Sequence, residues 1–214
     1  MALVRTPTIT GRSARRAAPA VLLALALTLA LCNASAHACG AAKQAGASKR
    51  GPGGGRAPLV IGDSVLLGGV PQAASAGYEV DARGCRQFGQ ALGMIAARRR
   101  AKTLPHLVVI ALGTNGSIRM SQIREAMKLV GRGRKLGLVT PRELGGGSGS
   151  DARVIRAAGR RFPGRVIVLD WVRVSGGRRG WFAGDGIHLG RSGASGLARL
   201  LRGALAFAIA PLCP

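Results

Sequence analysis

Ser64, Asp185 and His188 are the residues of this sequence whose types and spacing suit nucleophilic catalysis. A serine hydroxyl attacks an ester only if a base takes its proton and a third group orients that base. His188 is the best-placed histidine for this task, and Asp185 precedes it by three residues. In a tight turn that spacing lets the carboxylate reach the second ring nitrogen. The three residues therefore predict a serine hydrolase triad.

The oxyanion formed by such an attack needs hydrogen-bond donors, and two further positions suit this role. Asn115 follows the apolar run 108–114 and brings a side-chain amide, and Gly84 offers a backbone N–H at close approach. Both are therefore candidate donors to the oxyanion. Each such donor typically lowers the barrier by about 3–4 kcal/mol.

Each of these residues, taken alone, is more often structural. A serine after a strand is usually a helix N-cap. Asp185-Gly186 is a turn sequence, and Asn115-Gly116 is a frequent turn pair. The catalytic interpretation therefore depends on all of them meeting at one edge of a fold.

Apolar runs alternate with helical patterns from residue 58 onwards, which predicts the framework for these residues. The expected strands are Leu59–Ile61, Tyr78–Val80, Leu107–Ala111, Leu136–Val139 and Val166–Leu169. Amphipathic helices are expected around 88–95, 123–130, 151–158 and 197–208. The alternation predicts an α/β fold, a three-layer α/β/α sandwich around a mostly parallel sheet of about five strands. In open sheets of this kind, sites lie at the carboxyl ends of the strands.

The first 38 residues have the pattern of a secretory signal peptide. Four arginines precede an apolar run at 21–31, and the small-x-small sequences Ala34–Ala36 and Ala36–Ala38 follow it. The alternative is an uncleaved membrane anchor, since residues 17–36 are nearly long enough to span a bilayer. We therefore expect a secreted or cell-envelope protein.

Residues 39–57, which are rich in Gly, Ala, Lys and Ser, are expected to form a flexible linker without a core of its own. The folded domain is expected to run from 58 to 214. Trp181 and Phe182 lie in the loop before Asp185. They are interpreted either as a wall of the site or as a packing anchor.

Three cysteines follow residue 38, an odd number for an oxidising compartment. Cys39, Cys85 and Cys213 allow three pairings, of which we favour one that includes Cys213 and ties down the carboxyl terminus. Their spacing matches no zinc site, so no metal ion is expected. No cofactor is expected either.

The chain carries 32 Lys and Arg against 8 Asp and Glu, a formal charge of +24. Such a charge predicts attraction to anionic membranes or to an anionic cell-wall polymer. Nucleic acid is not expected as a partner, because few aromatic residues interleave with the cations for base stacking. The alternative is a basic surface that is merely solvated.

The four motifs together resemble the SGNH, or GDSL-type, hydrolase superfamily over residues 58 to about 207. The matching blocks are Gly62-Asp63-Ser64, Gly84, Gly113-Thr114-Asn115 and Asp185-Gly186-Ile187-His188. The resemblance implies an SGNH or flavodoxin-like sandwich with Ser64 as nucleophile, His188 as base and Asp185 as orienting acid. It also implies an oxyanion hole of the Ser64 N–H, Gly84 and Asn115.

A narrower resemblance is to the extracellular SGNH domain of peptidoglycan O-acetyltransferases. It is carried by Gly62–Val65, Val80–Ala82 with Arg86-Gln87, Leu112–Gly116, Asp170-Trp171 and Trp181. In that family the domain usually follows a multi-spanning membrane domain, which this sequence does not show. A transferase reaction would thus imply a separate membrane protein as acyl donor. Cys85 stands where that family tends to carry a serine, which leaves open whether Gly84 or Cys85 shapes the second block.

The expected function is that of a secreted serine esterase or acyltransferase. Its substrates would be acyl esters, in particular acetyl esters, of cell-envelope carbohydrate, or small esters. The alternatives are a secreted lipase or lysophospholipase with the same triad, and a non-catalytic envelope-binding module on the same fold.

Overall fold

The computed structural model of this protein describes residues 39–47, 51, 55–144 and 146–209. They lie in one compact unit that runs from Ala38 to Pro214. The predicted signal peptide and Cys213 lie outside the described residues. None of the helices in the described ranges is both long and apolar enough to cross a membrane.

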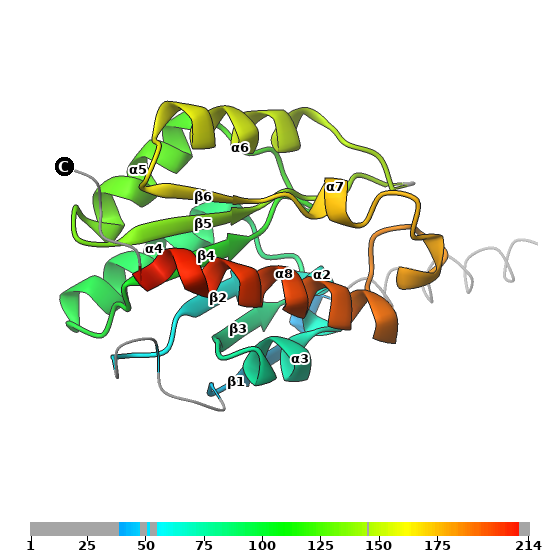
Figure 1. Cartoon of the computed structure of the whole chain (residues 1–214), viewed down its shortest axis with the longest axis horizontal. Helices are drawn as coiled ribbons and strands as arrows, with labels where there is room; N and C mark the ends of the chain where they lie inside the picture. The colour runs from blue at the N-terminus through cyan, green and yellow to red at the C-terminus, as the bar shows by residue number, and fades with distance from the viewer. Residues whose placement is uncertain (1–38, 48–50, 52–54, 145, 210–214) are drawn as a thin grey trace, which may run out of the picture. The chain divides into compact units, whose positions relative to one another are not determined.

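A six-stranded sheet forms the middle layer of this unit (Figure 1). Its strands, in spatial order, are β1 (Ala42–Ala45), β3 (Glu79–Arg83), β2 (Leu59–Gly62), β4 (Leu107–Ala111), β5 (Lys135–Val139) and β6 (Val166–Leu169). All neighbours pair in parallel except β1, which pairs antiparallel with β3. The predicted three-layer α/β class with a mostly parallel sheet is therefore confirmed.

Helices cover both faces of the sheet because alternate side chains of each buried strand point to opposite faces. On one face lie α4 (Phe88–Arg100), α5 (Met120–Val130) and α6 (Ser150–Arg161). Their core includes Leu59, Ile61, Ile95, Ile110, Ile123 and Ile155. On the other lie α2 (Ser64–Leu67), α3 (Val70–Ser75), α7 (Trp171–Val174) and α8 (Arg191–Ile209). Their core includes Val60, Val80, Val109, Trp171, Leu197 and Leu201.

Strand β3 lies later in the chain than the strand Tyr78–Val80 that the sequence indicated. Tyr78 was expected inside it, but its N–H closes the turn after α3 by donating to the Ala73 carbonyl at 3.2 Å. The buried Tyr78 hydroxyl donates to the Leu201 carbonyl of α8 at 2.8 Å. The strand extends instead to Arg83, through a carboxylate, Asp81, that Arg86 neutralises at 2.6 Å.

The linker predicted for 39–57 is wrong for residues 42–45, which form the edge strand β1. Its residues are mostly exposed, and they do not alternate between apolar and polar in the way that predicts a strand. Pairing with β3 stabilises it, and Gln44 Nε2 also donates to the Asp81 carboxylate at 2.8 Å. The sixth strand of the sheet is therefore a consequence of tertiary contacts.

A disulfide joins Cys39 to Cys85. The favoured pairing, one that includes Cys213, is therefore wrong. The bridge fastens the segment before β1 to the loop after β3, which is the second sequence block.

The carboxyl ends of β2 and β4 lie side by side, with Gly62 opposite Ala111. From β2 the chain passes to β3 on one side, and it later returns to β4 on the other. The strand order therefore reverses between β2 and β4. Reversal points of this kind open a crevice at the carboxyl edge of a parallel sheet. Ser64 lies two residues beyond the end of β2, and Asn115 lies four residues beyond the end of β4.

Candidate active site

Ser64 is the first residue of α2, two residues beyond the end of β2. The N-cap of this helix is Asp63, whose carboxylate accepts from the Val65 N–H at 3.0 Å. The capping function that a serine often performs here therefore belongs to Asp63. The Ser64 hydroxyl is left to bond elsewhere.

The structure brings Ser64, His188 and Asp185 into one hydrogen-bonded chain. Ser64 Oγ lies 3.0 Å from His188 Nε2, across 124 positions of sequence. His188 Nδ1 lies 2.5 Å from Asp185 Oδ2. The hydroxyl thus meets one ring nitrogen while a carboxylate meets the other, which is the arrangement that draws a proton from a nucleophile.

Asp185 is held by the turn that it begins. Its Oδ1 accepts from the backbone N–H groups of Ile187, at 2.9 Å, and His188, at 3.0 Å, while Oδ2 faces the imidazole. Gly186 supplies the positive φ of 71° that this turn requires. The hydrogen bond to His188 and those from the backbone lower the Asp185 pKa to about 2. The carboxylate is therefore ionised over the whole range in which the protein would work.

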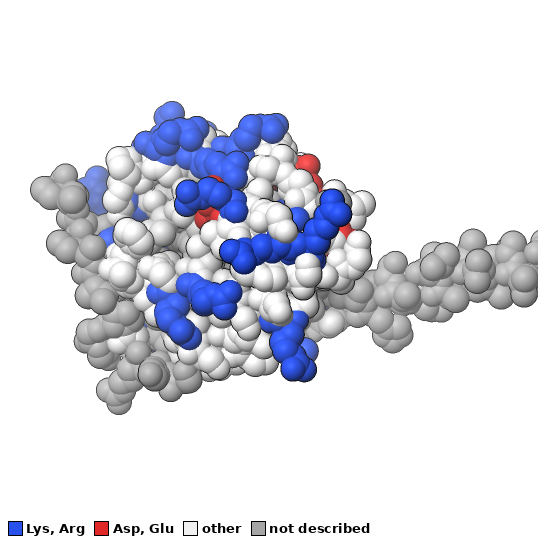
Figure 2. All heavy atoms as spheres, turned by 45° about the vertical axis from the view of Figure 1, so that its right-hand side comes forward, with Lys and Arg blue, Asp and Glu red and all other residues white. Residues whose placement is uncertain are grey.

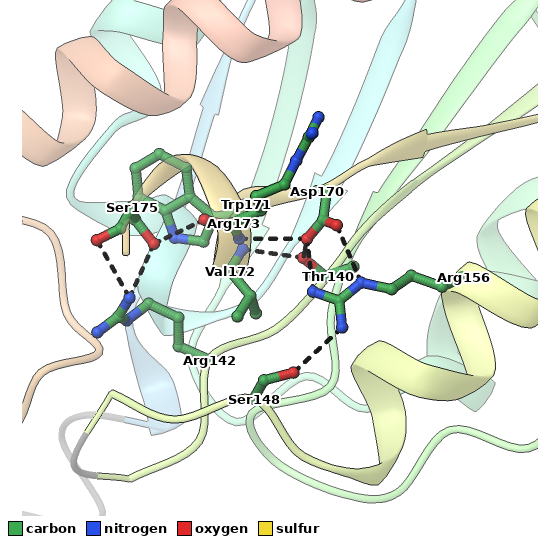
Figure 3. Close-up of polar contacts among 9 residues, drawn as sticks. All are labelled: Thr140, Arg142, Ser148, Arg156, Asp170, Trp171, Val172, Arg173 and Ser175. Atoms are coloured by element: carbon green, nitrogen blue, oxygen red, sulfur yellow. Dashed lines mark hydrogen bonds and ion pairs between the residues drawn. The ribbon is translucent and has the colours of Figure 1, made fainter. Parts of the chain in front are cut away.

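Arg142, in the loop after β5, is hydrogen-bonded to this turn. Its Nε donates to the Gly186 carbonyl at 2.9 Å, and one terminal nitrogen donates to the buried Ser175 hydroxyl at 2.9 Å (Figure 3). The guanidinium also lies 4.2 Å from the centre of the Phe182 ring. Burial lowers the Arg142 pKa. The sequence analysis missed this residue, because nothing in its local pattern links it to a motif more than forty positions later.

Trp181 and Phe182 anchor the same loop. Trp181 stacks on buried Trp171 with ring centres 5.6 Å apart, and Phe182 meets the edge of Trp171 at 5.9 Å. The Trp181 carbonyl accepts from the Gly190 N–H, and Phe182 forms a β-bridge with Leu189. Of the two interpretations of these aromatic residues, the contacts favour the packing anchor.

Asn115 presents a side-chain amide nitrogen that is buried and has no hydrogen-bond partner among the described residues. Its loop is held on both sides. Gly113 has a φ of 131° and packs so closely on Pro141 that a Cβ would lie 2.7 Å from the proline ring. The Ile118 N–H donates to the buried Asp151 carboxylate at 2.9 Å. A buried amide donor without a partner, beside the strand that precedes Ser64, suits an oxyanion.

Gly84 does not present a free donor, which corrects that part of the expected oxyanion hole. Its N–H donates to the Ala41 carbonyl at 2.8 Å, as a continuation of the β1–β3 pairing. The next residue, Cys85, has a φ of 55°, and no acceptor in the described part of the chain pairs with its N–H. Arg86 holds this loop to β2 by donating to the Gly62 carbonyl at 3.0 Å. In this second block, Cys85 is the residue with an available N–H.

A small cavity of about 30 Å³ lies at this edge of the sheet. Its lining includes the neighbours of the triad, Asp63, Val65 and Ile187, together with Thr114 and Arg142. Burial raises the pKa of Asp63, and hydrogen bonds from Val65 and Thr114 oppose that shift. Among the described residues no group of three or more His, Cys, Asp or Glu is placed to hold a metal ion.

Comparison with known sequences finds relatives among bacterial O-acetyltransferases. O-acetyltransferase OatA of Staphylococcus aureus is 30% identical over 149 residues, which make up 67% of this chain and 24% of that protein. The match thus spans about a quarter of the curated relative's length. No family model matches the chain.

Solved structures give the same result. The C-terminal catalytic domain of peptidoglycan O-acetyltransferase A from Streptococcus pneumoniae, solved with a methylsulfonyl adduct, superimposes with a TM-score of 0.61 and 26% identity. That match covers 71% of this chain and 93% of the domain. A GDSL-like lipase from Bacteroides thetaiotaomicron has the same fold, with a TM-score of 0.54, 18% identity and coverage of 71% and 88%. The chain therefore has the fold of SGNH, or GDSL-type, enzymes, and its sequence and structure are similar to those of O-acetyltransferase catalytic domains.

Proposed function

We propose that this chain is a secreted serine esterase or acyltransferase that acts on acyl esters, in particular acetyl esters, of cell-envelope carbohydrate. The observation that carries the proposal is the continuous contact from Ser64 Oγ through the His188 ring to the Asp185 carboxylate. The similarity to a peptidoglycan O-acetyltransferase domain supports the choice of carbohydrate and acetyl group.

In the proposed reaction the Ser64 oxygen attacks the acyl carbon while its proton passes to His188 Nε2. Asp185 stabilises the imidazolium, and the oxyanion accepts hydrogen bonds from Asn115 Nδ2 and from backbone N–H groups of Ser64 and the second block. Collapse expels the alcohol, which takes the proton from His188. Water or a sugar hydroxyl then resolves the acyl-serine with His188 again as base, which gives hydrolysis or transfer.

The choice of a short acyl group rests on the similarity to the catalytic domain of an O-acetyltransferase. A lipase or lysophospholipase would need a longer apolar groove at this position. That alternative is therefore the second candidate. For transfer, a membrane protein that delivers the acyl group remains part of the proposal.

The test is hydrolysis of p-nitrophenyl acetate, butyrate and octanoate by the purified protein and by its Ser64→Ala variant. Acetate should be the best substrate, and the variant should lose at least about a thousandfold in kcat/KM. A preference for octanoate would favour the lipase. Equal turnover by both proteins would exclude Ser64 as nucleophile. Absence of turnover in both would point to the binding module, unless acetyl transfer to a glycan from a membrane donor then proved Ser64-dependent.

A further inference from the structure

A cavity of about 560 Å³ lies near the C-terminal ends of α4, α5 and α6, at the amino ends of the strands. We call it the amino-end cavity. Binding sites for small ligands typically have volumes of about 300–1,000 Å³. Figure 1 shows β5 and β6 pointing away from this end, towards α7. The amino-end cavity shares no residue with the cavity beside the triad. Its lining consists of Arg99, Arg124, Met127, Lys128, Gly131, Arg132, Phe162, Pro163 and Arg165.

Five of these nine residues are cationic, and none of the nine is acidic. Lys128 lies 3.8 Å from the Glu125 carboxylate on the same helix. Arg124 and Arg132 are exposed, and neither forms an ion pair within the described ranges of the chain. Arg124 and Lys128 are four residues apart on α5, a spacing at which like charges repel. An anion bound among these side chains would relieve the repulsion.

Two of the guanidinium groups are held in place by backbone carbonyls at the end of α5. Arg99 Nη1 donates to the Lys128 and Leu129 carbonyls, at 2.5 and 2.9 Å. Arg165 Nη2 donates to the Gly131 carbonyl at 2.8 Å. In each arginine the other terminal nitrogen pairs with no acceptor among the described residues. Because these side chains are already ordered, they lose little conformational entropy when they bind an anion.

The capping of α5 explains only part of this arrangement. Arginines near a helix C-terminus often donate to the last carbonyls, as Arg99 and Arg165 do. Arg124 and Arg132 form no hydrogen bond with any other residue that the structure describes. Their presence in the same lining is therefore left without an intramolecular reason, and an external anion supplies one.

The placement of the cations favours a phosphate over a carboxylate. They come from α4, from α5 and from the segments before β5 and β6, so they reach the cavity from several sides. A phosphate group presents its oxygens in several directions, whereas a carboxylate presents two in one plane. Guanidinium groups bind phosphate oxygens through paired N–H donors. Several arginines can therefore contact one phosphate group here at the same time.

The apolar part of the surface favours a polymer over a membrane or a nucleic acid. Proteins that lie on a membrane insert apolar side chains into it. Leu144 and Phe207 are the large hydrophobic residues exposed in the described part of the chain, and neither lines this cavity. Single-stranded nucleic acid stacks its bases on aromatic rings. Phe162 is the aromatic residue of this lining, and it is half-buried. A phosphodiester chain without bases meets both conditions.

We propose that the amino-end cavity binds phosphate groups of a phosphodiester-linked polyol polymer. Arg124 and Arg132 supply the free cations, and Arg99 and Arg165 supply oriented N–H donors. The inference goes beyond the proposed function, because this cavity takes no part in ester chemistry. A strand of five residues such as β5 spans roughly 16 Å. The polymer thus holds the protein by one end of the sheet and leaves the carboxyl edge free for the substrate.

The test measures binding to the whole purified protein by calorimetry. The probes are a glycerol-phosphate octamer, an octamer of glutamate with matched charge, single-stranded dT octamer, and vesicles that contain phosphatidylglycerol. The glycerol-phosphate octamer should bind at least about tenfold more tightly than the glutamate octamer at about 0.15 M salt. Equal affinity for these two probes would show that net charge alone attracts them. Tighter binding of the vesicles or of the dT octamer would overturn the choice of polymer.

Matched variants locate the site. Arg124→Gln with Arg132→Gln should weaken binding of the glycerol-phosphate octamer about tenfold or more. Arg191→Gln with Arg202→Gln, at exposed positions of α8, removes the same charge and should leave the affinity nearly unchanged. Arg99→Lys retains the charge but loses the paired donors, so it should weaken binding severalfold. Equal losses in the two double variants would overturn the proposal.

A catalytic control separates this inference from the proposed function. The Arg124→Gln, Arg132→Gln protein should keep its thermal stability and hydrolyse p-nitrophenyl acetate as fast as the parent, because neither residue lines the cavity beside the triad. Loss of polymer binding with intact ester hydrolysis supports a separate site. Loss of both, with thermal stability unchanged, would contradict it. Ester hydrolysis that does not depend on Ser64 would contradict the proposed function alone.

Discussion

At the scale of single residues, both carboxylate oxygens of Asp185 contribute to the site. One carboxylate oxygen accepts two backbone N–H groups and so shapes the turn, while the other faces His188 Nδ1. A single side chain therefore sets both the conformation of the loop and the orientation of the imidazole. The residue that the sequence marks as an orienting acid is also the residue that folds its own motif.

Asp185→Asn separates these two tasks. Asparagine retains an oxygen for the backbone N–H groups of Ile187 and His188, but it removes the charge that stabilises the imidazolium and selects the tautomer. We expect kcat for p-nitrophenyl acetate to fall by about 100- to 10,000-fold with little change in KM. An unaltered kcat would contradict the proposed role of Asp185.

The stability that is lost in Asp185→Asn should also depend on pH. The folded-state pKa of Asp185, about 2, lies below the value of about 3.9 expected in the unfolded chain. Its stabilising contribution is therefore fully present above the unfolded value and is lost as the pH falls through about 2. Urea denaturation should show a deficit for Asp185→Asn at pH 6 that disappears near pH 2. A deficit that grew on acidification would contradict the assignment.

At the scale of elements, two contacts between segments distant in the sequence support the site. The loop after β5 contributes Arg142, which ties the Gly186 carbonyl to Ser175 and Phe182. A second arginine of this region, Arg156, binds Asp170 through two hydrogen bonds of 2.9 Å and so supports the start of α7 (Figure 3). Arg156 pairs with a carboxylate, whereas Arg142 contacts the turn that carries His188.

Replacement of Arg142 should therefore affect catalysis more than replacement of Arg156. We expect Arg142→Met to lower kcat about 10- to 100-fold, because a small displacement of His188 from Ser64 weakens proton transfer. Arg142→Lys should recover part of the loss. Arg156→Met serves as the control and should reduce thermal stability with kcat retained. Equal losses of kcat in the two methionine variants would show that Arg142 acts only through general stability.

The disulfide between Cys39 and Cys85 is the second such support. It holds the segment whose Ala41 carbonyl accepts a hydrogen bond from the Gly84 N–H. It ends at Cys85, whose own N–H has no acceptor among the described residues. Cys39→Ser should lower the free energy of unfolding by about 2–4 kcal/mol, as expected for a loop of this separation, 46 residues. It should also lower kcat, because the second block loses its anchor. Reduction of the parent protein should reproduce both changes, and a variant with full kcat would show that the bridge is purely structural.

At the scale of the whole molecule, basic side chains lie around the candidate site (Figure 2), and others, such as Arg99, Arg124 and Arg132, lie towards the amino ends of the strands. The catalytic edge is the carboxyl edge of the sheet, and the view that brings this side forward shows many basic side chains (Figure 2). A positive surface beside the site raises the local concentration of anionic substrates and speeds their capture. The excess of arginine is thus consistent with a substrate that carries negative charge.

The sequence by itself determined the class of the fold and indicated Ser64, Asp185 and His188 as a candidate triad. Buried parallel strands need continuous apolar runs, so Leu107–Ala111 and Val166–Leu169 could be placed residue by residue. Ser64, Asp185 and His188 could be selected because their motifs are local and follow or precede predicted elements.

Only the tertiary structure decided the features that depend on partners distant in the chain. These features are the polar strand β1, the Cys39–Cys85 pairing, the hydrogen bond from the Gly84 N–H to Ala41, and the contact of Arg142 with Gly186, and all join segments about 35 or more positions apart. Such contacts leave no periodic signal, because their stability comes from one specific partner rather than from burial of a repeated face. The motifs are therefore readable in the sequence, whereas the supports that hold them in register are visible only in the folded chain.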